Sequence, residues 1–190
     1  MIIGMTGKAR SGKNTAADMY VEALDGEVEV FGFADPLKEM ALEGNPIVFF
    51  APEPDGSLRL LRLADVVEDI GWERAKDEYP EVRRHLQWLG TNVVRRVRET
   101  YWVDQGIERA RAARAAGKHV IITDVRFPNE AEAVWSQAGM VVKTVRPGLG
   151  GGENGGHSSE TSIDLIDEDV TLLNDGSLDD LRAKVLDSLT

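Results

Sequence analysis

The sequence predicts an α/β protein with a mostly parallel β-sheet and helices on both of its faces. Short apolar segments with strand-like spacing alternate along the chain with segments whose apolar residues recur at helical spacing. The segment 119–123 is a continuous apolar run, as expected for a strand that is buried on both faces of a parallel sheet. With 190 residues, 42% of them hydrophobic, the chain has the size of one ordinary domain, and we take residues 1–190 as a single domain.

Local signals define the elements of the first half of the chain. Asp35 and Pro36 provide an N-cap and a proline at the first helical position for the second helix. Two apolar runs on either side of Pro54-Asp55-Gly56 predict a hairpin. The expected elements are strands over 1–6 and 28–33, helices over 14–24 and 35–42, the hairpin over 45–61, and helices over 64–76 and 81–99.

In the second half, Gly117 ends a helix that is rich in alanine and arginine, and apolar residues at helical spacing mark a terminal helix. The expected elements are a helix over 104–116, a strand over 119–123, a helix over 128–137, strands over 140–145 and 170–173, and a helix over 178–189. Two stretches interrupt the alternation, the segment 45–101 and the glycine-rich loop 147–162. We expect both to be moving parts, although the loop could also be a solvated linker.

Charge and composition exclude several classes of function. The chain carries 22 basic and 33 acidic residues, a net charge of -11, which argues against general affinity for nucleic acid or for an anionic membrane. It has no cysteine and three scattered histidines, so disulfides, thiol catalysis and zinc sites are excluded. No apolar run approaches the ~18 residues of a membrane span. We expect no signal peptide and a cytoplasmic location, and any phosphate must be bound by a few local cations.

Residues 7–13 match the phosphate-binding pattern G-x-x-x-x-G-K between a strand and a helix. In such a loop, backbone N–H groups and the positive end of the helix dipole surround a phosphate, and Lys13 would reach the β/γ bridge. A glycine-rich turn that merely joined two elements would need neither the lysine nor the spacing. The expected nucleotide-binding residues are Gly7, Lys8, Ala9, Arg10, Ser11, Gly12, Lys13, Asn14 and Thr15.

The residues after the lysine depart from the usual pattern, which continues with Ser or Thr. This chain has Asn14 and then Thr15. Asn14 could offer its amide oxygen to Mg²⁺ or hold one of the waters of the ion, and Thr15 would then contact the α-phosphate. The sequence leaves these arrangements open.

Two carboxylates follow predicted strands. Asp124 ends the apolar strand, at the edge where open parallel sheets bind ligands, and Arg126 and Glu130 follow it. Asp124 could orient Mg²⁺ or its water while Arg126 neutralises charge on a transferring phosphoryl group, and helix capping is the alternative for Asp124. Asp35 ends the second strand in the same way, with Lys38 one turn on, and is either a catalytic group or an N-cap.

A third group lies within the segment 45–101. Arg83, Gln87, Thr91 and Arg95 recur every four residues, which keeps them on one slowly drifting face of a helix. Two guanidiniums that frame an amide and a hydroxyl would suit a phosphate and the edge of a base. A solvated, arginine-rich surface is the alternative interpretation.

The motifs together resemble those of the deoxynucleoside monophosphate kinases of bacteriophages, a branch of the P-loop kinases. The resemblance spans most of the chain in the order of the family, and although residues 7–13 are generic to P-loop proteins, the whole set is specific. It lies in residues 7–13, Phe33-Ala34-Asp35-Pro36-Leu37-Lys38, Leu86-Gln87-x-Leu89-Gly90-Thr91 with Arg83 and Arg95, Thr123-Asp124-Val125-Arg126-Phe127-Pro128-Asn129-Glu130, Val145-Arg146-Pro147-Gly148, His157-x-Ser159-Glu160 and Asn174-Asp175-Gly176.

The resemblance implies a three-layer P-loop kinase fold with five parallel core strands in the order 2-3-1-4-5, a monophosphate-binding lobe over 45–101 and a lid over 147–162. It implies transfer of the γ-phosphoryl group of ATP to a deoxynucleoside monophosphate, with Mg²⁺ as cofactor. The protein would be a monomer or a homodimer, in the host cytoplasm if a phage encodes it.

Residue roles follow from the same resemblance. Lys13 and Arg10 would stabilise the γ-phosphoryl group, and Arg146 would lie near the adenine or reach the phosphates. Asp35 and Asp124 would organise the acceptor and Mg²⁺, the latter with Asn14 or Thr15. The acceptor-binding residues would be Asp35, Lys38, Arg83, Gln87, Thr91, Arg95, Arg126 and Glu130.

The chain also departs from this family pattern. The lids of nucleoside monophosphate kinases commonly carry arginines, whereas residues 147–181 contain neither Arg nor Lys. Charge compensation would therefore come from Arg10, Lys13, Arg126 or Arg146. The alternatives are another small-molecule P-loop kinase, similar to dephospho-coenzyme A kinase or phosphomevalonate kinase, or a regulatory nucleotide-binding switch.

Overall fold

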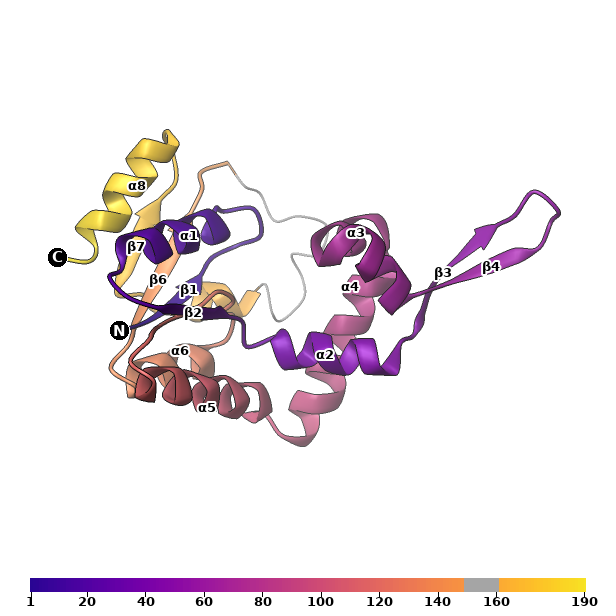
Figure 1. The fold of residues 1–190 in the computed structure, drawn as a ribbon, viewed down its shortest axis with the longest axis horizontal. Helices are drawn as coiled ribbons and strands as arrows, with labels where there is room; N and C mark the ends of the chain where they lie inside the picture. Colours follow the sequence, from indigo (N-terminus) through magenta and orange to yellow (C-terminus); the bar gives the residue numbers. More distant parts are fainter. Residues whose placement is uncertain (149–160) are drawn as a thin grey trace. The chain divides into compact units, whose positions relative to one another are not determined.

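The structure of the protein is a computed structural model that describes residues 1–148 and 161–190 (Figure 1). The chain divides into two compact units, each with its own apolar core. Unit 1 comprises Met1–Phe33 and Val103–Thr190, and unit 2 comprises Ala34–Trp102. Unit 2 is wider than the predicted lobe over 45–101, because helix α2 (Asp35–Gly44) packs against the helices that follow it.

Unit 1 is built on a five-stranded parallel sheet. Its strands are β1 (Ile2–Thr6), β2 (Val28–Phe31), β5 (His119–Ile122), β6 (Met140–Val145) and β7 (Val170–Leu173). Their order is β2-β5-β1-β6-β7, and every neighbouring pair is parallel. When the hairpin strands of unit 2 are left out of the numbering, this is the order 2-3-1-4-5, so the predicted fold class is confirmed.

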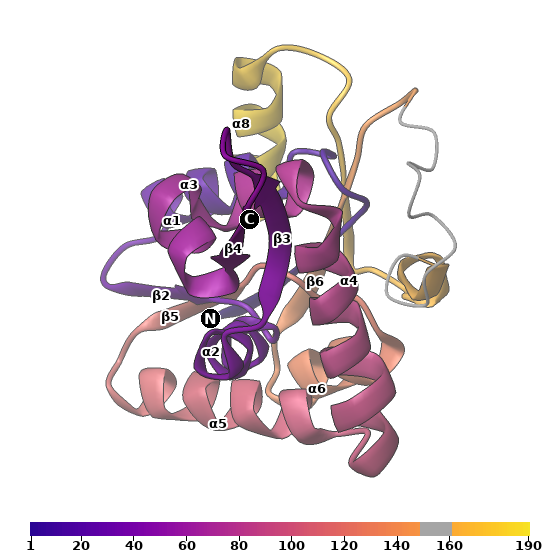
Figure 2. The same ribbon diagram turned by 90° about the vertical axis from the view of Figure 1, so that its right-hand side faces the viewer.

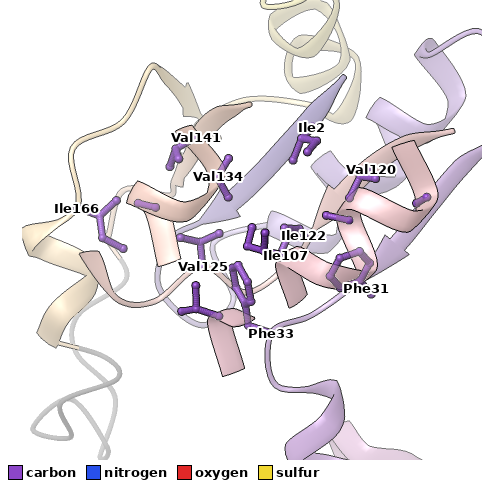
Figure 3. Packing of buried hydrophobic residues seen from close by; sticks show 14 residues of the cluster. Ile2, Phe31, Phe33, Ile107, Val120, Ile122, Val125, Val134, Val141 and Ile166 are labelled. Atoms are coloured by element: carbon purple, nitrogen blue, oxygen red, sulfur yellow. The ribbon is translucent and has the colours of Figure 1, made fainter. Parts of the chain in front are cut away.

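Helices cover both faces of this sheet (Figure 1). On one face lie α1 (Lys13–Ala23) and α8 (Leu178–Asp187), and on the other lie α5 (Tyr101–Ala115) and α6 (Pro128–Ser136), which Figure 2 shows from the side. Successive side chains of a strand point to opposite faces, so Ile3 packs under α1 and α8 while Ile2 packs under α5 and α6. Figure 3 shows the second of these two clusters.

The ends of some elements differ from the prediction. Helix α5 begins at Tyr101 and not at residue 104. A short 3₁₀ helix, η2 (Ser162–Leu165), was not expected, and the buried side chains of Ile163 and Ile166 anchor it in unit 1. Residues 149–160 of the predicted lid, and with them the motif His157-x-Ser159-Glu160, lie outside the described residues. None of the described helices combines the length and the apolar character needed to cross a membrane.

Unit 2 is mostly helical and carries the predicted hairpin. Its remaining elements are β3 (Ile47–Pro52), β4 (Leu58–Arg62), α3 (Leu63–Glu78), α4 (Pro80–Gln87) and the π-helix η1 (Trp88–Arg95). Strands β3 and β4 pair in antiparallel fashion. Helix α3 bends at Gly71, whose φ of 74° is not helical. The core of the unit consists of Ala41, Val48, Leu63, Val66, Ala75 and Val82.

The segment predicted as helical over 81–99 is helical, but α4 passes directly into the π-helix η1, a change of helix type that was not predicted. Gly90, in the π-helix, lies so close to α2 that a Cβ atom there would be 2.8 Å from Cδ2 of Leu37. The buried indole of Trp102 donates a hydrogen bond to the carbonyl oxygen of Gly90 at 3.1 Å. These contacts come from residues distant in sequence, which the periodicity of the segment does not reveal.

The substitution Trp102→Phe tests the importance of this hydrogen bond. We expect the free energy of unfolding to fall by about 1–3 kcal/mol, because the buried Gly90 carbonyl loses its donor. Urea unfolding followed by circular dichroism measures the change. Trp88→Phe is the matched control, since Trp88 is 54% exposed and its indole makes no hydrogen bond to the described residues. Equal destabilisation by both substitutions would contradict the assignment.

Candidate functional site

The loop between β1 and α1 has the backbone conformation of a phosphate-binding loop. Gly7, Arg10 and Gly12 have positive φ angles of 134°, 63° and 100°. A Cβ atom at Gly7 would collide with the carbonyl oxygen of Thr144, so glycine is required there by both backbone angle and space. Gly12 is the N-cap of α1. The N–H groups in the first turn of α1 have no acceptor within the helix and are therefore available at this loop.

Lys13 folds back over the same loop. Its Nζ donates to the carbonyl oxygens of Gly7 at 2.7 Å and Lys8 at 3.0 Å. Phosphate oxygens, which carry charge, would be stronger acceptors than these carbonyls. Arg10 is exposed, as are Asn14 and Thr15 in the first turn of α1. The arrangement places two cationic side chains and two oxygen-bearing side chains around a backbone shaped for phosphate.

Two of the predicted loop residues, Ser11 and Lys8, differ from the others in the burial or the partners of their side chains. The Ser11 side chain is 2% exposed, and its hydroxyl has no partner among the described residues, so Ser11 presents only its backbone to the loop opening. Lys8 forms an ion pair with Asp164 of η2, with Nζ and Oδ2 3.2 Å apart. Arg146 is exposed directly after β6.

Asp124 lies after β5, beside the end of β2. Its Oδ1 accepts a hydrogen bond from the backbone N–H of Phe33 at 2.6 Å. A Cβ atom at Gly32 would be 2.7 Å from Oδ2, so a glycine is needed for this approach. The helix that follows has Phe127 as its N-cap, and a different carboxylate reaches its first turn. The capping alternative for Asp124 is therefore wrong.

That carboxylate belongs to Glu130, which is 3% exposed. Its Oε2 accepts hydrogen bonds from the backbone N–H groups of Arg126 at 2.7 Å and Phe127 at 3.1 Å. The prediction placed Glu130 among the acceptor-binding residues. Its buried carboxylate holds the turn that carries Arg126, in the way that an acidic residue supports a helix N-terminus.

The remaining predicted residues lie in unit 2. Asp35 is the first residue of α2, and Ala34 occupies the N-cap position, so the interpretation of Asp35 as an N-cap is wrong. Oδ1 of Asp35 instead accepts a hydrogen bond from Nζ of Lys38 at 2.9 Å.

The four residues spaced by four fall across the junction of α4 and η1. Arg83 and Gln87 belong to α4, and Thr91 and Arg95 belong to η1. Four residues advance slightly more than one turn of an α-helix. They advance slightly less than one turn of the wider π-helix. The side-chain direction therefore rotates one way along α4 and the opposite way along η1, and the two rotations offset each other. The π-helix thus helps to keep the four side chains on one face.

Glu73 of α3, which the sequence did not single out, pairs with Lys76 of the same helix. Glu73 accepts a hydrogen bond from Lys76 at 2.6 Å. Burial by itself would raise the pKa of Glu73, but this hydrogen bond and the positive charges of Lys38 and Arg83 outweigh it and lower the pKa below its ordinary value. Arg83 also pairs with Asp77 at 3.2 Å. The carboxylates in contact with these two cations are Asp77 for Arg83 and Asp35 for Lys38.

Comparison with known proteins is consistent with this site. The sequence profile of the family described as "Deoxynucleotide monophosphate kinase" matches residues 55–185. A protein of Acanthamoeba polyphaga mimivirus, named as a candidate deoxynucleotide monophosphate kinase, is 27% identical over 98% of this chain and 94% of its own length. The deoxynucleotide monophosphate kinase of Enterobacteria phage T4 is 29% identical over 67% of this chain, which spans only 51% of that relative.

Solved structures resemble the chain more distantly. Dephospho-CoA kinase from Campylobacter jejuni aligns with 99% of this chain and 95% of its own length, at 14% identity and a TM-score of 0.47. Similarity at this level carries no functional information.

The substitution Lys13→Ala tests the loop directly. We expect binding of Mg-ATP to weaken at least about tenfold, because charge-assisted hydrogen bonds to phosphate oxygens are lost. Isothermal titration calorimetry measures the affinity, and thermal unfolding without nucleotide checks the fold. Lys118→Ala is the matched control, since that ammonium pairs with Glu27 at 3.2 Å. Wild-type affinity in Lys13→Ala would refute the role of the loop.

Proposed function

We propose that this chain, which belongs to the deoxynucleotide monophosphate kinase family, transfers the γ-phosphoryl group of ATP to the phosphate of a deoxynucleoside monophosphate. The products are ADP and a deoxynucleoside diphosphate. The observation that carries the proposal is the loop of residues 7–13, with its positive φ angles and with Lys13 folded over it. In the reaction, an oxygen of the monophosphate forms a bond to the γ-phosphorus while the bond to the β,γ-bridging oxygen breaks.

Positioning and electrostatic stabilisation supply most of the catalysis in such a transfer, because the attacking phosphate oxygen already carries negative charge. On the donor side, backbone N–H groups of the loop and the N-terminus of α1 bind the ATP phosphates. Lys13 exchanges the carbonyl oxygens of Gly7 and Lys8 for phosphate oxygens. Arg10 and Arg126 add positive charge near the γ-phosphoryl group, and Arg146 contributes at the end of β6.

Mg²⁺ fits the oxygen donors at the loop. This ion is commonly held by one or two carboxylates together with substrate phosphates. Asn14 and Thr15 present oxygen atoms from the exposed first turn of α1, and Asp124 is held at the end of β5 by its hydrogen bond to Phe33. When bound, the ion neutralises charge on the phosphates.

The acceptor side is provided by unit 2. Arg83 and Arg95, with Gln87 and Thr91 between them, suit a phosphate and a base edge. Asp35 orients the ammonium of Lys38 through their contact at 2.9 Å. Asp77 balances the charge of Arg83 before the substrate arrives. A phosphate dianion that enters this face competes with those carboxylates for the same cations.

The proposal is tested by an ADP-release assay with Mg-ATP. The acceptors are dAMP, dGMP, dCMP and dTMP, their ribose counterparts, and dephospho-coenzyme A and phosphomevalonate as controls. We expect one or more deoxynucleotides to stimulate ADP release strongly. Silence across all nucleotides, with stimulation by another acceptor, would show that the chain is a different small-molecule kinase. Acceptor-independent hydrolysis alone would favour a regulatory nucleotide-binding protein.

The acceptor face is tested by Arg83→Ala and Arg95→Ala. We expect each to raise the KM for the monophosphate about tenfold or more and to leave the KM for ATP within about twofold, because the lost guanidinium binds only the acceptor phosphate. Arg84→Ala is the matched control, since that side chain is exposed and pairs with Glu81 at 2.8 Å. Steady-state kinetics with each substrate varied in turn gives both constants. Equal changes in the two KM values would refute this assignment.

A further inference from the structure

The end of β7 contacts the phosphate-binding loop within unit 1. Asn174 follows β7 directly, and its backbone N–H donates to the carbonyl oxygen of Val145 at 2.7 Å, which extends the pairing of β7 with β6. Its side-chain Nδ2 donates to the carbonyl oxygen of Ser11 at 2.9 Å. One residue thereby connects the edge of the sheet to a loop that lies 163 positions earlier in the sequence.

This hydrogen bond determines the direction of one loop peptide. The peptide between Ser11 and Gly12 is trans, so its C=O and N–H groups point in opposite directions. With the Ser11 carbonyl held on Asn174, the N–H of Gly12 points away from Asn174. That N–H has no acceptor among the described residues, and it lies at the N-cap of α1, where backbone N–H groups bind phosphate.

The loop lies against the sheet at Gly7 and Gly12, the two glycines of its motif. A Cβ atom at Gly12 would collide with Nδ2 of Asn174, just as one at Gly7 would collide with the carbonyl oxygen of Thr144. Because Gly12 has no Cβ atom, the Asn174 amide can lie against it. The buried hydroxyl of Ser11 has no partner among the described residues and provides no second support for this peptide.

We propose that Asn174 is a positioning residue for ATP, whose amide keeps the Ser11–Gly12 peptide turned so that the Gly12 N–H is available to a phosphate. The inference rests on the proposed function and deepens its donor site. Asn174 acts through the loop and does not touch the nucleotide. Its loss should therefore weaken ATP binding without changing how the acceptor monophosphate is bound.

Two variants test the proposal with the full chain. Asn174→Ala removes the amide, and Asn174→Asp keeps the shape but replaces the donor with a carboxylate oxygen that faces the Ser11 carbonyl. The matched control is Asp175→Asn. Asp175 is the neighbouring residue, and its carboxylate pairs with Lys184 of α8 at 2.8 Å.

We expect the Kd for Mg-ATP, measured by calorimetry, to rise about threefold to tenfold in Asn174→Ala, which is the loss of one neutral hydrogen bond. It should rise further in Asn174→Asp, because like partial charges then oppose each other. The KM for the monophosphate should stay unchanged in both variants, and Asp175→Asn should behave as the wild type. Melting temperatures without nucleotide separate this role from a purely structural one, which would lower the melting temperature and leave the Kd unaltered.

Wild-type Mg-ATP affinity in both folded Asn174 variants would overturn the proposal. An equal rise in the Kd for Mg-ATP and in the KM for the monophosphate would also overturn it. If the proposed function itself is wrong, the ADP-release assay gives a different result, because the wild-type chain would then release no ADP in response to any deoxynucleotide.

Discussion

The phosphate-binding loop imposes the main constraint on unit 1. Its backbone must keep several N–H groups unpaired and fixed in direction, although such groups ordinarily find partners on folding. The positive φ angles at Gly7, Arg10 and Gly12 make this shape possible. Packing then maintains it, because the loop follows the central strand β1 and lies against Thr144 of β6, the neighbouring strand, and Asn174 at the end of β7, the next strand beyond it. Apolar side chains packed on both faces of the sheet hold these strand ends in place.

Positive charge is available locally in a protein whose net charge is -11. At physiological ionic strength, charges on the surface are screened beyond about 8 Å, so nearby cations decide whether an anion binds. Several of these cations already contact a carboxylate, as Lys38 contacts Asp35 and Arg83 contacts Asp77. These contacts hold long side chains in place before a phosphate arrives. They also lower the cost of ordering those side chains on binding.

The geometry of the site depends on supporting residues as well as on those that would touch substrate. Glu130 is buried and holds the turn of Arg126, and the amide of Asn174 holds a loop peptide. Gly32 provides the space in which Asp124 approaches the end of β2. Each acts on the backbone or by leaving room. Glu130 and Asn174 belong to motifs whose other residues carry the more obvious chemistry, and Gly32 directly precedes such a motif.

The sequence by itself determined the fold class and the identity of the phosphate-binding loop. These two features follow from apolar periodicity and from glycines at fixed spacing, which are local properties of the chain. The order of the core strands came from the resemblance of the whole set of motifs to a known family, and the pairing of the strands agrees with it. Residues 140–145 and 170–173 form strands with the predicted bounds. The π-helix and the contact of Asn174 with Ser11 were decided only by the tertiary structure. Both depend on residues that meet across long separations in sequence, Gly90 with Leu37 and Asn174 with Ser11, where close packing and hydrogen bonding override the local preference of each segment.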